Sequence, residues 1–161
     1  MSTSDPEDMP GLVMRPPFFL AIALGAALIL DWLTGLSFLA EPFPLVLQFW
    51  AGLVVTAAAV ALSVAGFREF TRAGTNVDPF EPALQLVTSG PYRFTRNPMY
   101  LGMVLCLLGL SLMLSLEWGL ILTPVLWLAF DRLVVAREEA YLGRRFGEPY
   151  EAFRARTRRW L

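Results

Sequence analysis

The sequence predicts an all-α integral-membrane protein, a bundle of four transmembrane helices followed by a cytoplasmic C-terminal helical segment. Two observations carry this prediction. The 161 residues are 56% hydrophobic and only 17% charged, whereas a soluble domain has about 25% charged residues. The charges also lie in blocks between long apolar runs, as in proteins whose solvent is the bilayer. At this length one domain is expected.

The apolar runs define four spans and the segments between them. We expect spans at about 17–33, 45–67, 99–116 and 118–135, a polar N-terminal tail at 1–16, a cytoplasmic loop at 68–98 and a C-terminal helical segment at 136–161, with 17–161 forming a single membrane domain. The run 45–67 carries no charge and can cross a hydrocarbon core of about 30 Å. The N-terminus is acidic, which argues against a signal peptide. The last two spans are so close in sequence that they must form a helical hairpin.

The arginines predict how the bundle is oriented. The segments expected outside contain Asp31, Glu41 and Glu117 and no arginine. The arginines of the other side are Arg68, Arg72, Arg93 and Arg96 in the long loop and Arg137, Arg144, Arg145, Arg154, Arg156, Arg158 and Arg159 in the tail. By the positive-inside rule both termini are cytoplasmic, in what we interpret as a bacterial inner membrane. The last four arginines are interpreted as a patch for anionic lipid headgroups.

The composition also excludes several kinds of chemistry. Histidine is absent, which removes the usual general base at neutral pH and the commonest metal ligand. Cys106 is the single cysteine, so no disulfide can form within the chain, and we expect a small buried hydrophobic residue there. No metal site is predicted. The net charge of −1 gives no global positive field for nucleic acid.

Polar residues gather at two places that should lie close together. Arg96 and Asn97 precede Pro98, where a helix is expected to begin, and Glu138 and Glu139 follow the last span. These are the cytoplasmic ends of the two hairpin helices. The first-turn N–H groups at Pro98 are unpaired and attract a carboxylate. Two interpretations are equally good here: Asn97 caps the helix while Arg93 and Arg96 face lipid phosphates, or this segment binds a ligand.

The two adjacent glutamates are expected to have different roles. Neighbouring side chains on a helix point about 100° apart, so one can face the site while the other pairs with arginine or water. Carboxylates this close to hydrocarbon suggest a cationic partner. The alternatives for that partner are the ammonium group of a ligand, Arg96, Arg132 and Arg137. Asp131 and Arg132, deeper in the helix, are expected to form ion pairs within the bundle.

Several segments stand in an order and spacing that resemble a known family. They are Gly90–Arg93, Arg96–Gly102, Glu138–Leu142 and Phe146–Tyr150. Together they resemble the C-terminal half of the isoprenylcysteine carboxyl methyltransferases, and the phospholipid (phosphatidylethanolamine) N-methyltransferases share the pattern. Gly74–Pro79 resembles a segment common in bacterial members. The likeness covers roughly residues 68–156, and the series of motifs makes it specific.

This resemblance implies an all-helical membrane methyltransferase that encloses S-adenosylmethionine at its cytoplasmic face, unlike the soluble Rossmann type. The catalytic residues it implies are Glu138, Glu139 and Arg96. The cofactor-binding residues it implies are Tyr92, Arg96, Asn97, Pro98, Tyr100, Leu101, Gly102, Glu138 and Glu139. In this view one glutamate binds the amino group of the cofactor, Arg96 pairs with its carboxylate, and Tyr92 or Tyr100 packs on the adenosine. Many members have histidine in place of Asn97, and asparagine cannot act as a general base.

We therefore expect methyl transfer to a lipid-like or prenylated acceptor through a carboxylate, thiol or amine, with membrane lipids as further partners. The lack of histidine favours a nucleophile that is already deprotonated. Two other functions stay open. A non-catalytic membrane assembly protein would need only the four spans. An NADPH-dependent oxidoreductase of the sterol-reductase type would be expected to be longer and to have more spans.

Overall fold

The chain folds almost entirely into helices. The computed structural model describes residues 10–36 and 45–161. Its helices are α1 (Pro16–Thr34), α2 (Leu45–Ala73), α3 (Pro98–Leu114), α4 (Glu117–Ala129), α5 (Ala136–Phe146) and α6 (Glu148–Arg156), with a 3₁₀ turn, η2 (Gly90–Arg93), and a π-helical turn, η3 (Phe130–Val135). No strand forms among these residues, which confirms the all-α class. Most of the predicted polar tail, and Glu41, Pro42 and Pro44 of the loop after the first span, lie outside the described residues.

Three helical stretches are long and apolar enough to cross a membrane. They are α1, α2 and the run Glu117–Phe146, in which α4, η3 and α5 follow one another without a break. The remaining apolar helix, α3, has only 17 residues, which corresponds to about 25 Å of helix. Many large apolar side chains on α1, α2 and α4 are exposed, as expected for surfaces that face lipid rather than water. The structure thus agrees with a helical membrane bundle.

Two helices continue beyond the ends of the predicted spans. Helix α2 runs through Arg68 to Ala73 and stops where Gly74 takes a φ of +66°, so the predicted loop 68–98 begins six residues later than expected. The last span likewise continues into α5. The first charged residues mark where a helix leaves hydrocarbon, but arginine and glutamate are good helix formers, so the helix itself continues.

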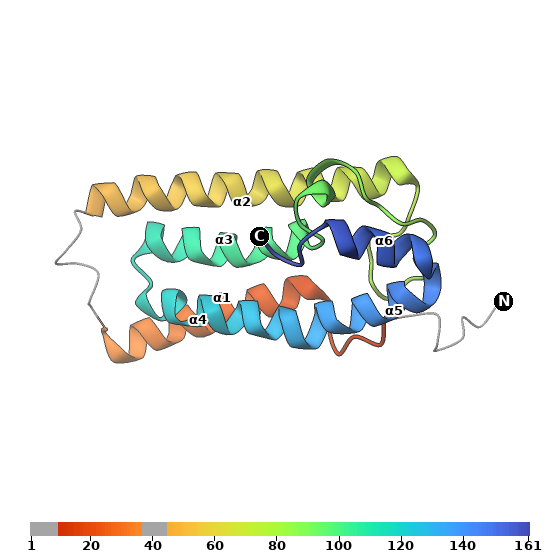
Figure 1. The fold of residues 1–161 in the computed structure, drawn as a ribbon. Coiled ribbons are helices and arrows are strands. Elements are labelled where there is room, and N and C mark those ends of the chain that lie inside the picture. The colour runs from red at the N-terminus through yellow and green to blue at the C-terminus, as the bar shows by residue number, and fades with distance from the viewer. Residues whose placement is uncertain (1–9, 37–44) are drawn as a thin grey trace.

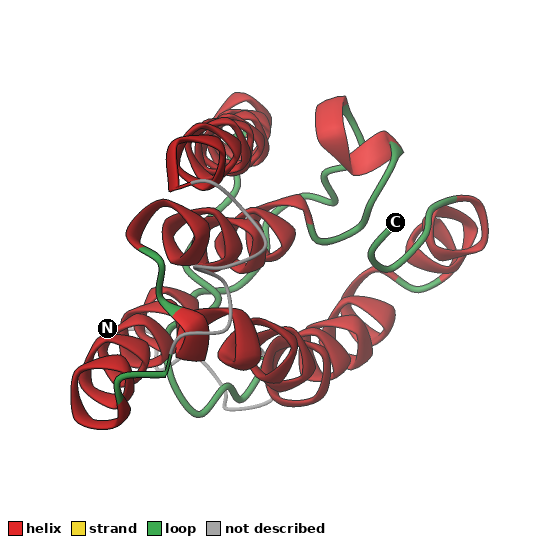
Figure 2. Cartoon of the chain, turned by 90° about the vertical axis from the view of Figure 1, so that its left-hand side faces the viewer, coloured by secondary structure: helices red, strands yellow, loops and turns green. Residues whose placement is uncertain are grey.

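Helix α3 occupies the centre of the bundle. It packs along α2 on one side and against α4 on the other, while α1 packs against α4 and α3 (Figure 1). The view from the end of the bundle shows the same order of helices (Figure 2). The end of α2, the start of α3, α5 and α6 gather at one end of the bundle, on the right in Figure 1. We call this the site end.

Small residues allow α2 and α3 to approach closely. A Cβ atom on Gly52 would lie 2.5 Å from the carbonyl oxygen of Gly109, and one on Gly102 would lie 2.1 Å from Oγ of Ser63 and 2.8 Å from the carbonyl oxygen of Ala59. Close backbone contact of this kind is how helices associate in lipid, where burial of apolar surface gives little driving force. The pairing fixes the start of α3 against α2 at the site end.

Polar contacts close the opposite end of the bundle. The carboxylate of Asp31, near the end of α1, accepts hydrogen bonds from the backbone N–H groups of Glu117 (3.0 Å) and Trp118 (3.2 Å). It therefore caps the N-terminus of α4, where such groups are otherwise unpaired. Between α3 and α4, Ser115 takes a φ of +53°, which makes the tight turn of the predicted hairpin.

Candidate active site

Two polar segments that are distant in sequence meet at the site end. Arg96, just before α3, pairs with Glu139 of α5 at an N–O distance of 2.7 Å. Tyr100, in the first turn of α3, donates a hydrogen bond to Glu138 of α5. The prediction that the loop before α3 and the segment after the last span converge is confirmed by these contacts.

A cavity of about 850 Å³ lies at this junction. Its wall comes from the end of α2, the loop 76–87, η2, the start of α3, α5 and α6. The residues of the predicted site that line it are Tyr92, Arg96, Asn97, Tyr100, Glu138 and Glu139. The sequence therefore identified one continuous surface, although its members come from three separate elements.

Glu138 is the acidic group best placed to meet a ligand. Its side chain is partly buried at the cavity wall and accepts a hydrogen bond from the hydroxyl of Tyr100. The Tyr100 ring is itself held by stacking on Phe130, with ring centroids 5.3 Å apart. Within the part of the chain that the structure describes, Glu138 forms no ion pair. A carboxylate in this position attracts a cation.

Glu139 points to a different set of partners. One of its oxygens accepts hydrogen bonds from Nε (3.1 Å) and Nη2 (2.7 Å) of Arg96, and its side chain is only 10% exposed. The remaining amino group of Arg96 donates to the backbone carbonyls of Arg154 (3.1 Å) and Thr157. Every nitrogen of this guanidinium is therefore engaged within the protein. Arg96 thus joins Glu139 to the C-terminal tail.

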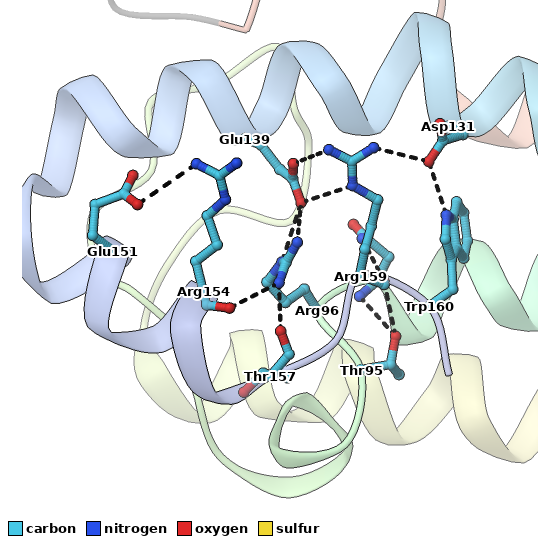
Figure 3. A network of polar contacts seen from close by, with 10 residues as sticks. Thr95, Arg96, Asp131, Glu139, Glu151, Arg154, Thr157, Arg159 and Trp160 are labelled. Carbon is cyan, nitrogen blue, oxygen red and sulfur yellow. Dashed lines mark hydrogen bonds and ion pairs between the residues drawn. The ribbon is translucent and has the colours of Figure 1, made fainter.

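Arg159 extends this pair into a network (Figure 3). Its guanidinium pairs with Glu139 and, at 3.1 Å, with Asp131 of η3. The same oxygen of Asp131 accepts a hydrogen bond of 2.9 Å from the indole of Trp160. Asp131 also contacts Arg132 at 3.4 Å, so the expected ion pair within the bundle forms. Arg159, one of the four arginines predicted to form a patch for lipid headgroups, thus pairs with two carboxylates beside the cavity.

The end of the chain lies against the loop that precedes α3. Thr95 and Arg158 form an isolated parallel bridge, and the backbone N–H of Arg96 donates to the carbonyl of Arg158 at 2.9 Å. Asn97 occupies the N-cap position of α3, but its side chain does not cap the helix. Instead, Nδ2 of Asn97 donates to the carbonyl of Arg159 at 2.9 Å. The cap interpretation is therefore wrong for the Asn97 side chain, which accepts no hydrogen bond from the first-turn N–H groups of α3 and donates to the tail instead.

The loop between α2 and η2 forms another wall of the cavity. Oγ1 of Thr75 accepts hydrogen bonds from the backbone of Leu84 (2.9 Å) and Gln85 (3.2 Å). The hydroxyl of Tyr141, on α5, accepts one from the backbone of Ala83 at 2.9 Å. These contacts tie the long polar loop to itself and to α5, and most of its residues between Asn76 and Val87 line the cavity.

Aromatic rings supply much of the remaining wall. Tyr92 and Phe70 both line the cavity and contact each other, with ring centroids 5.5 Å apart. Tyr150 and Phe153 of α6 lie in the same wall. Burial raises the pKa of Tyr92, and burial together with the nearby Glu139 raises the pKa of Tyr150 to about 12. Both hydroxyls therefore stay protonated at neutral pH and cannot act there as general bases.

Three residues of the predicted site do not line the cavity. A Cβ atom on Gly66 of α2 would lie 3.4 Å from Cγ of Pro98, and Gly102 lies against Ser63 of the same helix. Leu101 is buried, at 7% exposed, without contributing to the wall. We therefore assign Pro98 and Gly102 to the packing of α3 on α2, since their small or rigid shapes serve that contact.

The sequence interpretation missed several residues of the wall. Tyr141 and Tyr150 stand inside motifs that carried the family resemblance, and Tyr141 is three residues after Glu138, on the same helix face. That spacing was a usable signal. Arg159 had no such signal, because only the folded chain brings the tail to Glu139. Among the described residues no group of three or more metal-ligating side chains could hold a metal ion.

Comparison with known proteins gives independent information on the family of this chain. A profile described as phospholipid methyltransferase matches residues 47–149. Protein-S-isoprenylcysteine O-methyltransferase of Schizosaccharomyces pombe is 38% identical over 73 residues, which cover 45% of this chain and 30% of that protein. An uncharacterized protein of Haemophilus influenzae is 41% identical over 66 residues, which cover 39% of this chain and 100% of that protein. No solved structure matches the chain.

Proposed function

This chain belongs to the phospholipid methyltransferase family, and from that premise we propose that it transfers the methyl group of S-adenosylmethionine to a lipid-like acceptor at the membrane surface. The observation that carries the proposal is Glu138, a carboxylate at the cavity wall that receives a hydrogen bond from Tyr100. S-adenosylmethionine brings an ammonium group and a sulfonium, both cationic. Glu138 is placed to bind one of these two groups, and that contact would offset the free-energy cost of partly burying the Glu138 carboxylate.

The cavity also suits the rest of the cofactor. Its wall combines a few polar groups, among them Glu138 and Asn97, with apolar and aromatic side chains, which is typical of small-molecule sites. The rings of Tyr92, Phe70 and Tyr150 offer flat apolar surface for an adenine base. Tyr100 is less suited to that role, because Phe130 already stacks on its ring. We therefore assign adenosine packing to the Tyr92 side of the cavity.

Methyl transfer needs little acid–base chemistry from the protein. When bound, the cofactor supplies the activated methyl group, and the enzyme supplies alignment and a site that excludes water. Glu138 orients the cationic end, and the Arg96–Glu139–Arg159 network holds α3, α5 and the tail in fixed positions around it. With no histidine in the chain, the proposed acceptor presents its nucleophile already deprotonated, or loses its proton to Glu138.

The orientation in the membrane belongs to the same proposal. Arginines gather at the site end and are absent from the described residues between α3 and α4, so the positive-inside rule supports a cytoplasmic site. In a bacterium the bundle would sit in the inner membrane with both termini inside. Arg156 and Arg158 are exposed at this end, where they are available to anionic headgroups.

Isothermal titration of detergent-purified protein with S-adenosylmethionine, S-adenosylhomocysteine and NADPH tests the proposal. We expect saturable binding of the first two and none of NADPH. Binding of NADPH alone would favour the reductase class. Folded protein that binds none of the three would favour an assembly protein. Transfer of a radiolabelled methyl group into a total lipid extract then tests catalysis directly.

A further inference from the structure

A second hollow of about 590 Å³ adjoins the cofactor cavity. The two spaces share five wall residues: Val77, Asp78, Pro79, Met99 and Tyr100. Tyr100 is the important member of this group, because its hydroxyl donates to Glu138 in the cofactor cavity. A molecule in the second hollow would therefore lie next to the proposed methyl donor.

The second hollow lies between the N-terminal ends of α1 and α3, at the site end of the bundle. Pro16 and Pro17, the first residues of α1, form one side, and Met99 and Met103 of α3 form another. Apart from Arg15, Asp78 and the Tyr100 hydroxyl, the wall is apolar. Methionine adapts to ligands of irregular shape. This position and lining suit the upper part of an apolar chain whose remainder stays in lipid.

One cation stands in this apolar wall. Arg15 donates from Nε to Asp78 at 3.0 Å, and its guanidinium carbon lies 5.3 Å from the centre of the Phe80 ring. The side chain is 58% exposed. A guanidinium has further N–H groups on its two terminal nitrogens, and with the described residues these make no hydrogen bond. Arg15 is thus fixed in place while much of its binding capacity is unused.

Building on the proposed function, we propose that this second hollow receives the methyl acceptor and that Arg15 is its specificity-determining residue, binding an oxyanion on an amphiphilic acceptor. The oxyanion can be a carboxylate or a phosphate, since a guanidinium binds both in the same planar way. Asp78 holds Arg15 over Phe80 and competes with the incoming anion. The acceptor's nucleophilic atom then reaches the cofactor past Tyr100.

The test uses three amphiphiles with the same chain: oleate, oleyl phosphate and neutral oleyl alcohol. Each is titrated calorimetrically into protein saturated with S-adenosylhomocysteine in maltoside micelles, with empty micelles as the blank. We expect the wild type to bind one or both oxyanions about tenfold more tightly than the alcohol. Which oxyanion binds more tightly distinguishes a carboxylate acceptor from a phosphate-bearing one.

Variants decide whether Arg15 causes the preference. Arg15→Gln should remove it, and Asp78→Asn, which removes the competing carboxylate, should increase it. Arg72→Gln is the matched control, because Arg72 is also an exposed, ion-paired arginine at the site end, bonded to Glu69 at 2.6 Å and 73% exposed, and it does not line either space. The control should keep the full preference.

The outcomes separate this inference from the proposed function. A wild type that binds S-adenosylmethionine without preferring either oxyanion overturns the role of Arg15 and leaves the methyltransferase proposal standing. Loss of the preference in Arg72→Gln, or its decrease in Asp78→Asn, also overturns it. If Arg15→Gln does not fold, Arg15→Lys replaces it, with a reduced but measurable preference expected. If the protein binds neither cofactor form, the same titrations are made without cofactor, and an oxyanion preference there contradicts the proposed function alone.

Discussion

Replacing Glu138 or Glu139 by glutamine should produce two different defects from the same chemical change. Glutamine has nearly the shape of glutamate but no charge. Glu138 faces the cavity, and no ion pair with the described residues depends on it. Glu138→Gln should therefore remove the charge-assisted contact to a cationic ligand, worth about 1.5–3 kcal/mol. This corresponds to a dissociation constant for S-adenosylmethionine raised about 10- to 100-fold, with little change in stability.

Glu139→Gln removes the charge that Arg96 and Arg159 share. Breaking a buried ion pair from one side costs about 3–5 kcal/mol. The side chains of Arg96 and Glu139 are each 10% exposed, but that of Arg159 is 35% exposed, so solvent compensates part of its loss. We expect a cost of about 2–4 kcal/mol. In a chain of this size that lowers the unfolding temperature by roughly 5–15 °C.

The assay measures both quantities on each variant in the same detergent. Titration calorimetry gives the dissociation constant and the fraction of protein able to bind, and thermal unfolding gives the stability. Glu151→Gln is the control. Glu151 lies on the exposed face of α6, 3.6 Å from Arg154, and exposed pairs of this kind contribute at most about 1 kcal/mol.

Equal behaviour of the two variants would contradict these separate roles of Glu138 and Glu139. Equal losses of affinity, after correction for the active fraction, would mean that Glu138 has no special contact with the ligand. A Glu138→Gln variant as unstable as Glu139→Gln would show that Glu138 supports the fold. Glu139→Gln with unchanged unfolding temperature would mean that the network in Figure 3 contributes no stability.

Three further substitutions test the supporting structure. Arg96→Lys should lower unfolding temperature and cofactor affinity together, because lysine cannot bond Glu139 and two tail carbonyls at once; a fully active, equally stable variant would contradict this. Gly109→Val should destabilise the bundle by about 1–3 kcal/mol, because a Cβ atom at Gly109 would lie 2.3 Å from Oγ1 of Thr56. Gly25→Ala is the control and should not destabilise it, because a Cβ atom there has no neighbour within 4 Å. Denaturation in detergent mixtures measures both variants, and equal effects would argue against the packing role of Gly109. Trp160→Phe should lower the free energy of unfolding by about 1 kcal/mol, because phenylalanine cannot donate the hydrogen bond from the indole to Asp131. An unfolding curve equal to that of the wild type would show that this bond does not contribute to stability.

Part of the site was predictable because its signals are local. The motif around Arg96 and the pair Glu138–Glu139 adjoin helix ends that the apolar runs already marked. Neighbouring positions on a helix diverge by about 100°, which predicted that one glutamate can face the site while the other pairs with arginine or water. Which one does so depends on how α5 is rotated about its axis. Val134 and Val135, buried at 1% and 0% exposed, fix that rotation from the preceding turn.

The role of Arg96 was left open for a different reason. Helix capping, lipid contact and ligand binding all fit an arginine before the first turn of a helix. In the structure Arg96 donates to Glu139 and to the carbonyl oxygens at positions 154 and 157, partners that none of these alternatives included. These groups are 43 to 61 residues away in sequence, and no local pattern encodes their approach.

The sequence by itself determined that the chain is a helical membrane protein and where its apolar helices lie, because the transfer of side chains into lipid depends on each run of residues alone. It also determined the family, because the motifs keep their order and spacing. Only the tertiary structure decided that the C-terminal tail returns to the loop before α3 and places Arg159 beside Glu139. That contact depends on the packing of α3, α5 and α6 together. Electrostatic partners are chosen by distance in space, which the sequence does not contain.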